Sequence, residues 1–264
     1  MDLKTLIGQD LGTQVVSYDE LDAILYALAV GAPADRTDLI YERDLRVLPS
    51  YGCALGLWAV EACGAMGAYD PHRSLHAGQG LKVNKPMPKK AEFEMTGRVE
   101  AAWDKGKASM VEIVAHSEYF DATYSIFLPG VGEWGGERGP SAEKIEVGEA
   151  SWSAQFETTA NQAVLYRLTG DLHPIHVDPE VAKANTFERP ILHGLCTLGI
   201  AAREAAATVD AHPADLTALT ARLAAPVLPG DAIDLTAAAD GENVNFEACV
   251  GDSIVLKAAQ AQYR

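Results

Sequence analysis

The chain has 264 residues, of which 22% are charged and 48% hydrophobic, so it can build one large domain or two small ones. Its formal net charge of −16 would repel nucleic acid and anionic membrane surfaces, so we expect neither as a partner. We find no apolar run of membrane-spanning length, no secretion signal and no recognisable peroxisomal address, which makes the cytoplasm the expected location.

The first half of the chain reads as a helix followed by strands. The apolar segment from Gly52 to Ala68 is rich in alanine, which is typical of a helix buried on nearly all sides. Runs with β-branched residues and turn punctuation then predict three strands. These strands are Ala91–Ala101, Met110–His116 and Ala122–Leu128.

A glycine-rich stretch from Gly130 to Pro140 marks the clearest boundary in the chain. We therefore predict an N-terminal module at residues 1–135, a linker at 136–148 and a C-terminal module at 149–264. The two modules are of comparable length.

The second half has the same order of elements. The segment from Gly194 to Ala207 predicts a buried helix, and four strands are predicted after it. These strands are Thr217–Leu223, Ala232–Ala238, Val244–Val250 and Ile254–Gln260. A buried helix followed by consecutive antiparallel strands indicates an α+β fold in which a sheet wraps around the helix.

Three landmarks recur in both halves with nearly the same spacing, which indicates an internal repeat. A tyrosine is followed 26 or 28 residues later by the glycine that heads the helix, and a proline follows after 36 or 35 more. The landmarks are Tyr26, Gly52 and Pro88 in the first half, and Tyr166, Gly194 and Pro229 in the second.

The four cysteines lie in apolar stretches and form no Cys-x-x-Cys pair. We therefore expect buried, reduced thiols in a reducing compartment rather than disulfides or a metal site. They are Cys53, Cys63, Cys196 and Cys249.

The densest cluster of polar side chains lies in Gly170-Asp-Leu-His-Pro-Ile-His-Val-Asp178. Pro174 can open a helix, which would place Asp171 just ahead of that helix and His176 in its first turn. A carboxylate and an imidazole on opposite sides of one water can relay protons near neutral pH. Downstream, Gly194 begins a buried helix, so its backbone N–H could stabilise negative charge on a thioester oxygen.

These residues carry a family resemblance. The run from Tyr166 to Pro179, continued by Phe187-Glu-Arg-Pro-Ile-Leu-His-Gly-Leu-Cys-Thr-Leu-Gly199, closely resembles the hydratase 2 motif of MaoC-like, R-specific 2-enoyl-CoA hydratases. Segments such as Lys85-Pro-Met-Pro88 and Gly132-Glu-Trp-Gly-Gly136 resemble the N-terminal half of the two-module form found in peroxisomal multifunctional enzymes.

The resemblance implies a double hotdog fold with the active site in the second module. It implies that Asp171 and His176 hold a water and that the Gly194 amide binds the thioester oxygen, giving a (3R)-hydroxyacyl-CoA. We assign the water proton to His176 and its return delivery to Asp171. The first module has Gly31-Ala32-Pro33 where the second has Gly170-Asp171, so it is expected to be catalytically silent and to leave room for a bulky acyl chain.

The family resemblance also suggests substrate contacts. His173 stands where the family usually has Asn, His193 precedes Gly194, and Glu42 matches a family glutamate. Lys85, Lys89, Lys90 and Arg189 could meet CoA phosphates or belong to solvated turns. The segment Leu75-His-Ala-Gly-Gln79 lacks the acidic residue usual in the family. We expect a homodimer and no cofactor, with CoA belonging to the substrate.

Other interpretations use the same residues. Asp171 and Asp178 could each cap a helix, with a structural role favoured for Asp178. His173 and His176, with the two aspartates, could ligate a metal, although Pro174 between them and the family motif favour acid–base chemistry. The fold also supports thioester hydrolysis, or acyl-CoA binding without catalysis if His173 disables the water site.

Overall fold

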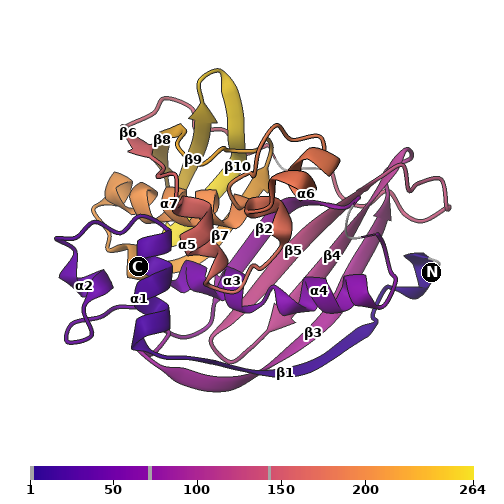
Figure 1. Ribbon diagram of the computed structural model, residues 1–264, viewed down its shortest axis with the longest axis horizontal. Helices are drawn as coiled ribbons and strands as arrows, with labels where there is room; N and C mark the ends of the chain where they lie inside the picture. Colours follow the sequence, from indigo (N-terminus) through magenta and orange to yellow (C-terminus); the bar gives the residue numbers. More distant parts are fainter. Residues whose placement is uncertain (1–2, 71–72, 142–143) are drawn as a thin grey trace.

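The computed structural model describes residues 3–70, 73–141 and 144–264, and its strands form one antiparallel sheet (Figure 1). The strand order across the sheet is β1-β3-β4-β5-β2-β7-β10-β9-β8-β6. The strands of the first half are β1 Asp10–Tyr18, β2 Leu75–Val83, β3 Ala91–Asp104, β4 Ala108–His116 and β5 Phe120–Pro129. Those of the second half are β6 Trp152–Glu157, β7 Leu216–Leu223, β8 Ala232–Asp240, β9 Asn243–Val250 and β10 Ser253–Tyr263.

Helices lie against one face of this sheet, and several short 3-10 turns connect them (Figure 1). The helices are α1 Glu20–Ala29, α2 Thr37–Ile40, α3 Gly52–Leu55, α4 Trp58–Ala65, α5 Gln162–Arg167, α6 Pro179–Ala184 and α7 Gly194–Ala205. The 3-10 turns are η1 Leu3–Thr5, η2 Pro49–Tyr51, η3 Pro174–His176, η4 Ala206–Val209 and η5 Pro213–Asp215.

The two halves of the chain meet in the middle of the sheet. β2 pairs antiparallel with β7 from Gly78↔Arg222 to Lys82↔Ala218, so hydrogen bonds continue from one half into the other. A Cβ on Gly78 would lie 3.4 Å from the carbonyl oxygen of Ala221, which leaves little room for a side chain at this seam. The α+β fold with a sheet wrapped around helices agrees with the sequence-based prediction.

Seven predicted strands are confirmed, as β3, β4, β5, β7, β8, β9 and β10. Strands β1, β2 and β6 were not predicted from the sequence. β2 was missed because its sequence, Leu-His-Ala-Gly-Gln-Gly-Leu-Lys-Val, contains two glycines and only one β-branched residue, so intrinsic propensity does not favour a strand. Pairing on both sides, with β5 and β7, overrides that weak propensity.

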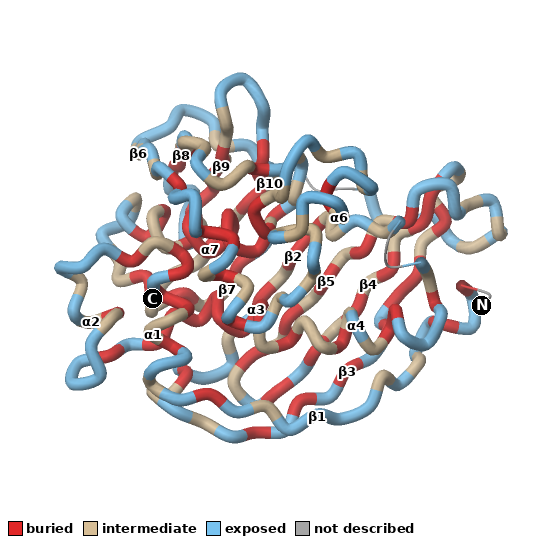
Figure 2. The backbone as a smooth tube through the Cα atoms, viewed as in Figure 1, coloured by how far each residue is buried: buried red, intermediate tan, exposed pale blue. Residues whose placement is uncertain are grey.

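The second helix prediction is confirmed, and the first is confirmed in part, because its range holds two separate helices, α3 and α4. Nine of the twelve residues of α7 are buried, whereas α4 buries only three of eight (Figure 2). The predicted helix from Gly52 to Ala68 is broken after Leu55, because the Tyr124 hydroxyl donates to the Cys53 carbonyl oxygen at 2.7 Å. An α-helix would offer that oxygen to Leu57 N–H, which instead bonds the Ala54 oxygen at 3.2 Å.

The C-terminal end of α1 is held by side chains of the second half. The carbonyl oxygen of Ala29 accepts a hydrogen bond from Gln162 Nε2 at 2.6 Å and one from Cys196 Sγ at 3.3 Å. Arg203 Nε donates to the carbonyl oxygen of Val30 at 3.0 Å. These bonds use carbonyls that a helix end leaves without internal partners, and they fix α1 onto α5 and α7.

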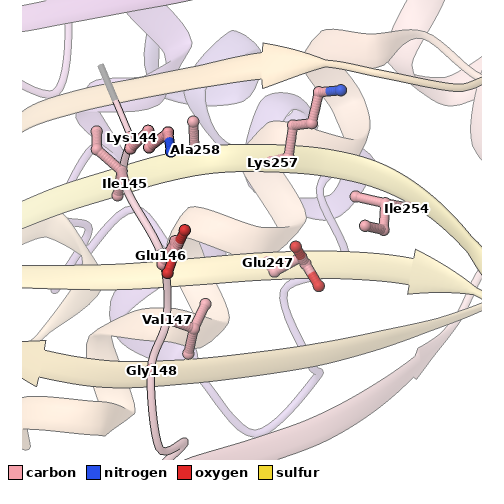
Figure 3. A pocket seen from close by; sticks show the side chains of 9 residues that line it. All are labelled: Lys144, Ile145, Glu146, Val147, Gly148, Glu247, Ile254, Lys257 and Ala258. Atoms are coloured by element: carbon pink, nitrogen blue, oxygen red, sulfur yellow. The ribbon is translucent and has the colours of Figure 1, made fainter. Parts of the chain in front are cut away.

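The segment between the halves crosses the sheet beside β9 and β10. A hollow of about 430 Å³ lies there, lined mainly by residues 144–148 together with Glu247, Ile254, Lys257 and Ala258 (Figure 3). Its lining contains no candidate site residue. The predicted linker at 136–148 falls between β5 and β6, although its residues 142 and 143 lie outside the described ranges.

Two further expectations can be compared with the structure. All four cysteines are free, and Cys53, Cys63 and Cys196 are buried as predicted, whereas Cys249 is only partly buried. In the part of the chain that the structure describes, no helix combines the length and apolar character needed to cross a membrane.

Candidate active site

The loop between α5 and α6 carries the acidic residue of the site. Gly170 adopts a positive φ of 133°, a conformation that residues with a Cβ rarely adopt. Asp171 follows, and one of its carboxylate oxygens accepts the His173 N–H at 3.2 Å. His173 Nδ1 in turn accepts the Ile175 N–H at 3.2 Å, which caps the turn η3 that Pro174 opens. The predicted placement of Asp171 ahead of this turn and of His176 within it is therefore correct.

The hydrogen bonds of His176 define its tautomer. Its Nδ1 lies 2.9 Å from the carbonyl oxygen of Ile191, and because a carbonyl only accepts, Nδ1 carries the proton. In the neutral ring Nε2 then has a free lone pair. Burial lowers the pKa of His176 from its usual 6.5, and the negative charge of Asp171 opposes that shift. His176 is thus a neutral proton acceptor at neutral pH.

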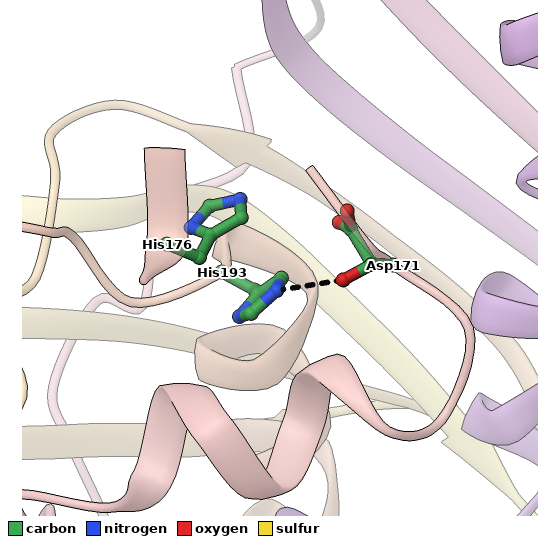
Figure 4. A group of neighbouring side chains, drawn as sticks. All are labelled: Asp171, His176 and His193. Carbon is green, nitrogen blue, oxygen red and sulfur yellow. Dashed lines mark hydrogen bonds between the residues drawn. The ribbon is translucent and has the colours of Figure 1, made fainter. Parts of the chain in front are cut away.

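Three side chains converge at this point (Figure 4). Asp171, His176 and His193 each offer a ligand atom, and these atoms lie within 4.8 Å of one another. The rings of His176 and His193 are stacked, with centroids 3.6 Å apart and an interplanar angle of 24°. His193 Nε2 also lies 3.2 Å from the main-chain oxygen of Asp171. A spacing of this size accommodates one water between the carboxylate and the imidazole of His176.

A metal ion is the competing occupant for three such ligand atoms. Nε2 of His193 must carry a proton, because its partner on Asp171 is a carbonyl oxygen. A metal at that nitrogen would have to displace both the proton and the hydrogen bond. The remaining acceptors are the Asp171 carboxylate, His176 Nε2 and the buried Nδ1 of His193. The first two suit a water molecule held by two groups.

Gly194 heads α7 immediately after His193. As the first helical residue it has no carbonyl one turn earlier to accept its N–H. The glycine is half-buried, and a Cβ there would lie 2.7 Å from Cδ1 of Leu223 on β7. Close packing against β7 therefore gives a structural reason for glycine, beside the predicted need for a ligand to approach.

The first half of the chain contributes two titratable groups that the sequence-based reasoning missed. The charge of Asp171 reaches His76 on β2 and Glu61 on α4. Burial lowers the pKa of His76, and the negative charge of Asp171 opposes that shift. The pKa of Glu61 is raised, mainly by partial burial and to a lesser extent by repulsion from Asp171. The available signals were His76 in a family-like segment and Glu61 as the acidic residue of an apolar helix.

The remaining predicted contacts lie in exposed segments. Lys85 pairs with Glu118 at 2.8 Å and follows the end of β2. His76 lies near the start of that strand, roughly 23 Å from its end by strand rise. Glu42 is exposed, and its main-chain oxygen accepts from Lys89 Nζ at 2.7 Å. Arg189 Nη1 donates to the Pro229 oxygen at 3.2 Å in the loop that leads to α7.

Two neighbours of the site have structural roles. Asp178 caps α6 by accepting the N–H groups of Glu180 at 2.8 Å and Val181 at 3.4 Å, as favoured from the sequence. Tyr166 is fully buried, with its ring centroid 4.9 Å from that of His193. Its hydroxyl has no hydrogen-bond partner within the described residues.

The fold and site together define a class of protein built from two hotdog modules in one chain. A MaoC-like dehydratase from Phytophthora capsici superposes with a TM-score of 0.89 at 22% identity, covering 100% of this chain and 98% of that one. A Mycobacterium tuberculosis protein described as a double hotdog has a TM-score of 0.58 at 14% identity, covering 97% and 95%.

The family follows from sequence comparisons. Residues 146–258 match the MaoC like domain, and residues 16–128 match the MFE-2 hydratase 2 N-terminal domain. The probable enoyl-CoA hydratase 2 of Dictyostelium discoideum is 31% identical over 89% of this chain and 86% of its own length. The peroxisomal multifunctional enzyme type 2 of Mus musculus is 30% identical over 96% of this chain but only 37% of its own length. The chain belongs to the MaoC-like hydratase 2 family of hydro-lyases.

Proposed function

We propose that this protein hydrates trans-2-enoyl-CoA to (3R)-3-hydroxyacyl-CoA. The observation that carries the proposal is the convergence of the Asp171 and His176 side chains in front of α7. Relatives named as enoyl-CoA hydratases give the proposal independent support, because they match this chain over nearly its whole length.

The tautomer of His176 supports its assignment as the base. Its free Nε2 can take a proton from water while Nδ1–H stays bound to the Ile191 oxygen, so the hydroxide equivalent attacks C3 of the enoyl group. Negative charge that develops on the thioester oxygen would be stabilised by the Gly194 N–H at the start of α7. His176 passes that proton to the Asp171 carboxylate, which delivers it to C2, so both side chains return to their starting states and one water has been added.

The broken helix of the first half supports a bulky acyl chain as the substrate. α4 buries only three of its eight residues, whereas α7 buries nine of twelve, so this half can accommodate a long or branched acyl group, fatty or steroidal. Such substrates would place the enzyme in the β-oxidation of fatty acids or sterol side chains. CoA belongs to the substrate, and we propose no separate cofactor.

The predicted contacts differ in how well their positions suit CoA. Arg189 lies in the loop that leads to the catalytic helix, so it is the best placed cation for a phosphate, with His173 and His193 nearer the reacting atoms. Lys85 and Glu42 lie in exposed turns and would contact only distant parts of CoA. A homodimer in the cytoplasm remains our proposal; the mouse relative is named as peroxisomal.

The test is a panel of trans-2-enoyl-CoA substrates, from short chains to a steroidal side chain. The ultraviolet absorbance of the conjugated thioester should fall on adding the protein, and chiral analysis should identify the 3R alcohol. Release of free CoA thiol would instead identify a thioester hydrolase. Binding of enoyl-CoA without any change in absorbance would identify a non-catalytic acyl-CoA-binding protein.

A further inference from the structure

We propose that His193 is the positioning residue of this site, which holds the main chain of Asp171 through Nε2–H and supports the ring of His176 by stacking. The inference rests on the proposed function, because it assigns a task to His193 within that reaction. It differs from the substrate contact expected from the sequence, since both interactions are with the catalytic residues themselves.

The contacts of His193 fix its ring in one place. It is 1% exposed, and it is the residue that immediately precedes α7. One ring contact is with His176, with centroids 3.6 Å apart, and another is with Tyr166, with centroids 4.9 Å apart. The hydrogen bond to the Asp171 main-chain oxygen, at 3.2 Å, links this fixed ring to the catalytic loop. A displacement of that loop would therefore move the carboxylate relative to His176.

The second nitrogen of His193 shows why the ring stays neutral. Nδ1 is buried and has no hydrogen-bond partner within the described residues. Protonation there would bury a cation without an acceptor, at the positive end of the α7 dipole. Burial first, then repulsion from His176, lower the pKa of His193 to about 3, while Asp171 opposes the shift and His173 adds to it. His176 thus stacks on an uncharged ring, which helps it to accept a proton.

Two substitutions separate the two tasks. His193→Phe keeps an aromatic face beside His176 but removes the donor to Asp171, whereas His193→Gln keeps a donor and removes the face. A misplacement of about 1 Å can cost roughly a hundredfold in rate. We expect each variant to lower kcat by at least about tenfold, with KM for enoyl-CoA changed by less than about threefold. His116→Phe, an exposed histidine on β4, is the matched control and should keep the wild-type kcat.

Ring nitrogen NMR of histidine-labelled wild-type protein tests the geometry without any activity assay. We expect His193 as the Nε2–H tautomer and His176 as the Nδ1–H tautomer, with His193 remaining neutral from about pH 5 to 9. A His193 that protonates in this range, or the opposite tautomer, would overturn the proposal. A wild-type kcat in both His193→Phe and His193→Gln would also overturn the proposal for His193, although the hydratase function would stand.

Failure of the proposed function has a different signature. A wild-type protein that hydrates no enoyl-CoA would remove the reaction, and the NMR result would still decide whether His193 holds the Asp171 loop. If His193→Phe does not fold, the kcat of His193→Gln and the ring tautomers of the wild-type protein still test the proposal.

Discussion

The residue that precedes the core helix differs between the two halves of the chain. In the second half His193 precedes Gly194 and stacks on His176, with ring centroids 3.6 Å apart. In the first half Tyr51 precedes Gly52 and stacks on Tyr26, with centroids 4.7 Å apart. The same position in the repeat thus supports an acid–base site in one half and aromatic packing in the other.

The turn that carries the acid shows the same divergence. Gly170 and Gly31 both have positive φ, at 133° and 77°. The next residue is Asp171 in the second half and the buried Ala32 in the first. A glycine turn is therefore present in both halves, while an acidic residue directly follows it only in the second half. The repeat therefore supplies backbone geometry, and a few side chains decide the chemistry.

The largest expected effect comes from removing the base in the second half. His176→Gln should lower kcat by about 10²–10⁴-fold, because general base catalysis typically contributes that much. Tyr51→Phe makes a matched change in the aromatic half and should leave kcat nearly unchanged. Steady-state rates on enoyl-CoA measure both, and comparable losses in the two variants would remove the functional distinction between the halves.

The glycine turns should respond differently to a methyl group. A Cβ on Gly31 would lie 2.2 Å from the ring of Phe156, whereas on Gly170 the nearest atom is the Ala54 oxygen at 3.7 Å. Gly31→Ala should lower the free energy of unfolding by about 3 kcal/mol and leave kcat of the folded enzyme intact. Gly170→Ala should cost about 1–2 kcal/mol for backbone strain and reduce kcat by moving Asp171. Denaturant unfolding and rates, measured on the same preparations, test the contrast.

The broken helix of the first half depends on one hydroxyl. Tyr124→Phe removes the donor to the Cys53 carbonyl oxygen, so we expect a loss of about 1 kcal/mol in the free energy of unfolding. A Cβ added at Gly56 would lie only 2.5 Å from that hydroxyl. Gly56→Ala should therefore lower the free energy of unfolding more in the wild-type protein than in the Tyr124→Phe variant, which lacks the hydroxyl. Additive effects in this double-mutant cycle would contradict the close approach of the Tyr124 hydroxyl to Gly56.

The smallest expected effect is a shift of the pH profile. Protonated His176 cannot accept a proton, so kcat/KM should fall as pH drops through the pKa of His176, which burial holds below 6.5. His173 contributes repulsion that lowers this pKa further. In His173→Asn that repulsion is gone, the pKa of His176 rises, and the acid limb should move to higher pH by a fraction of a unit. An acid limb that moves to lower pH would contradict this electrostatic role for His173.

Much of the fold was predictable because the signals were local. Pro174 and Gly194 each open an element, and runs with β-branched residues between turns predict strands; the predicted positions of these elements are confirmed. The break after Leu55 was not predictable, since it depends on Tyr124, a residue 71 positions away from Cys53. β2 was missed for the same reason, because long-range pairing rather than propensity makes it a strand.

The site was predictable only in part. Asp171 and His176 stand in one short motif, so sequence alone indicated that they act together. The contact of His193 with the Asp171 main chain and the influence of Asp171 on His76 and Glu61 depend on tertiary packing. Nothing in the local sequence places β2 and α4 of the first half beside a loop of the second.

The most direct test of the central claim compares two aspartates in the same segment. Asp171→Asn should lower kcat/KM for enoyl-CoA by at least about a hundredfold, because the amide cannot exchange the proton. Asp178→Asn should stay within about threefold of wild type, since asparagine also caps a helix. Equal activities of the two variants would contradict the claim that the second half carries its chemistry on Asp171.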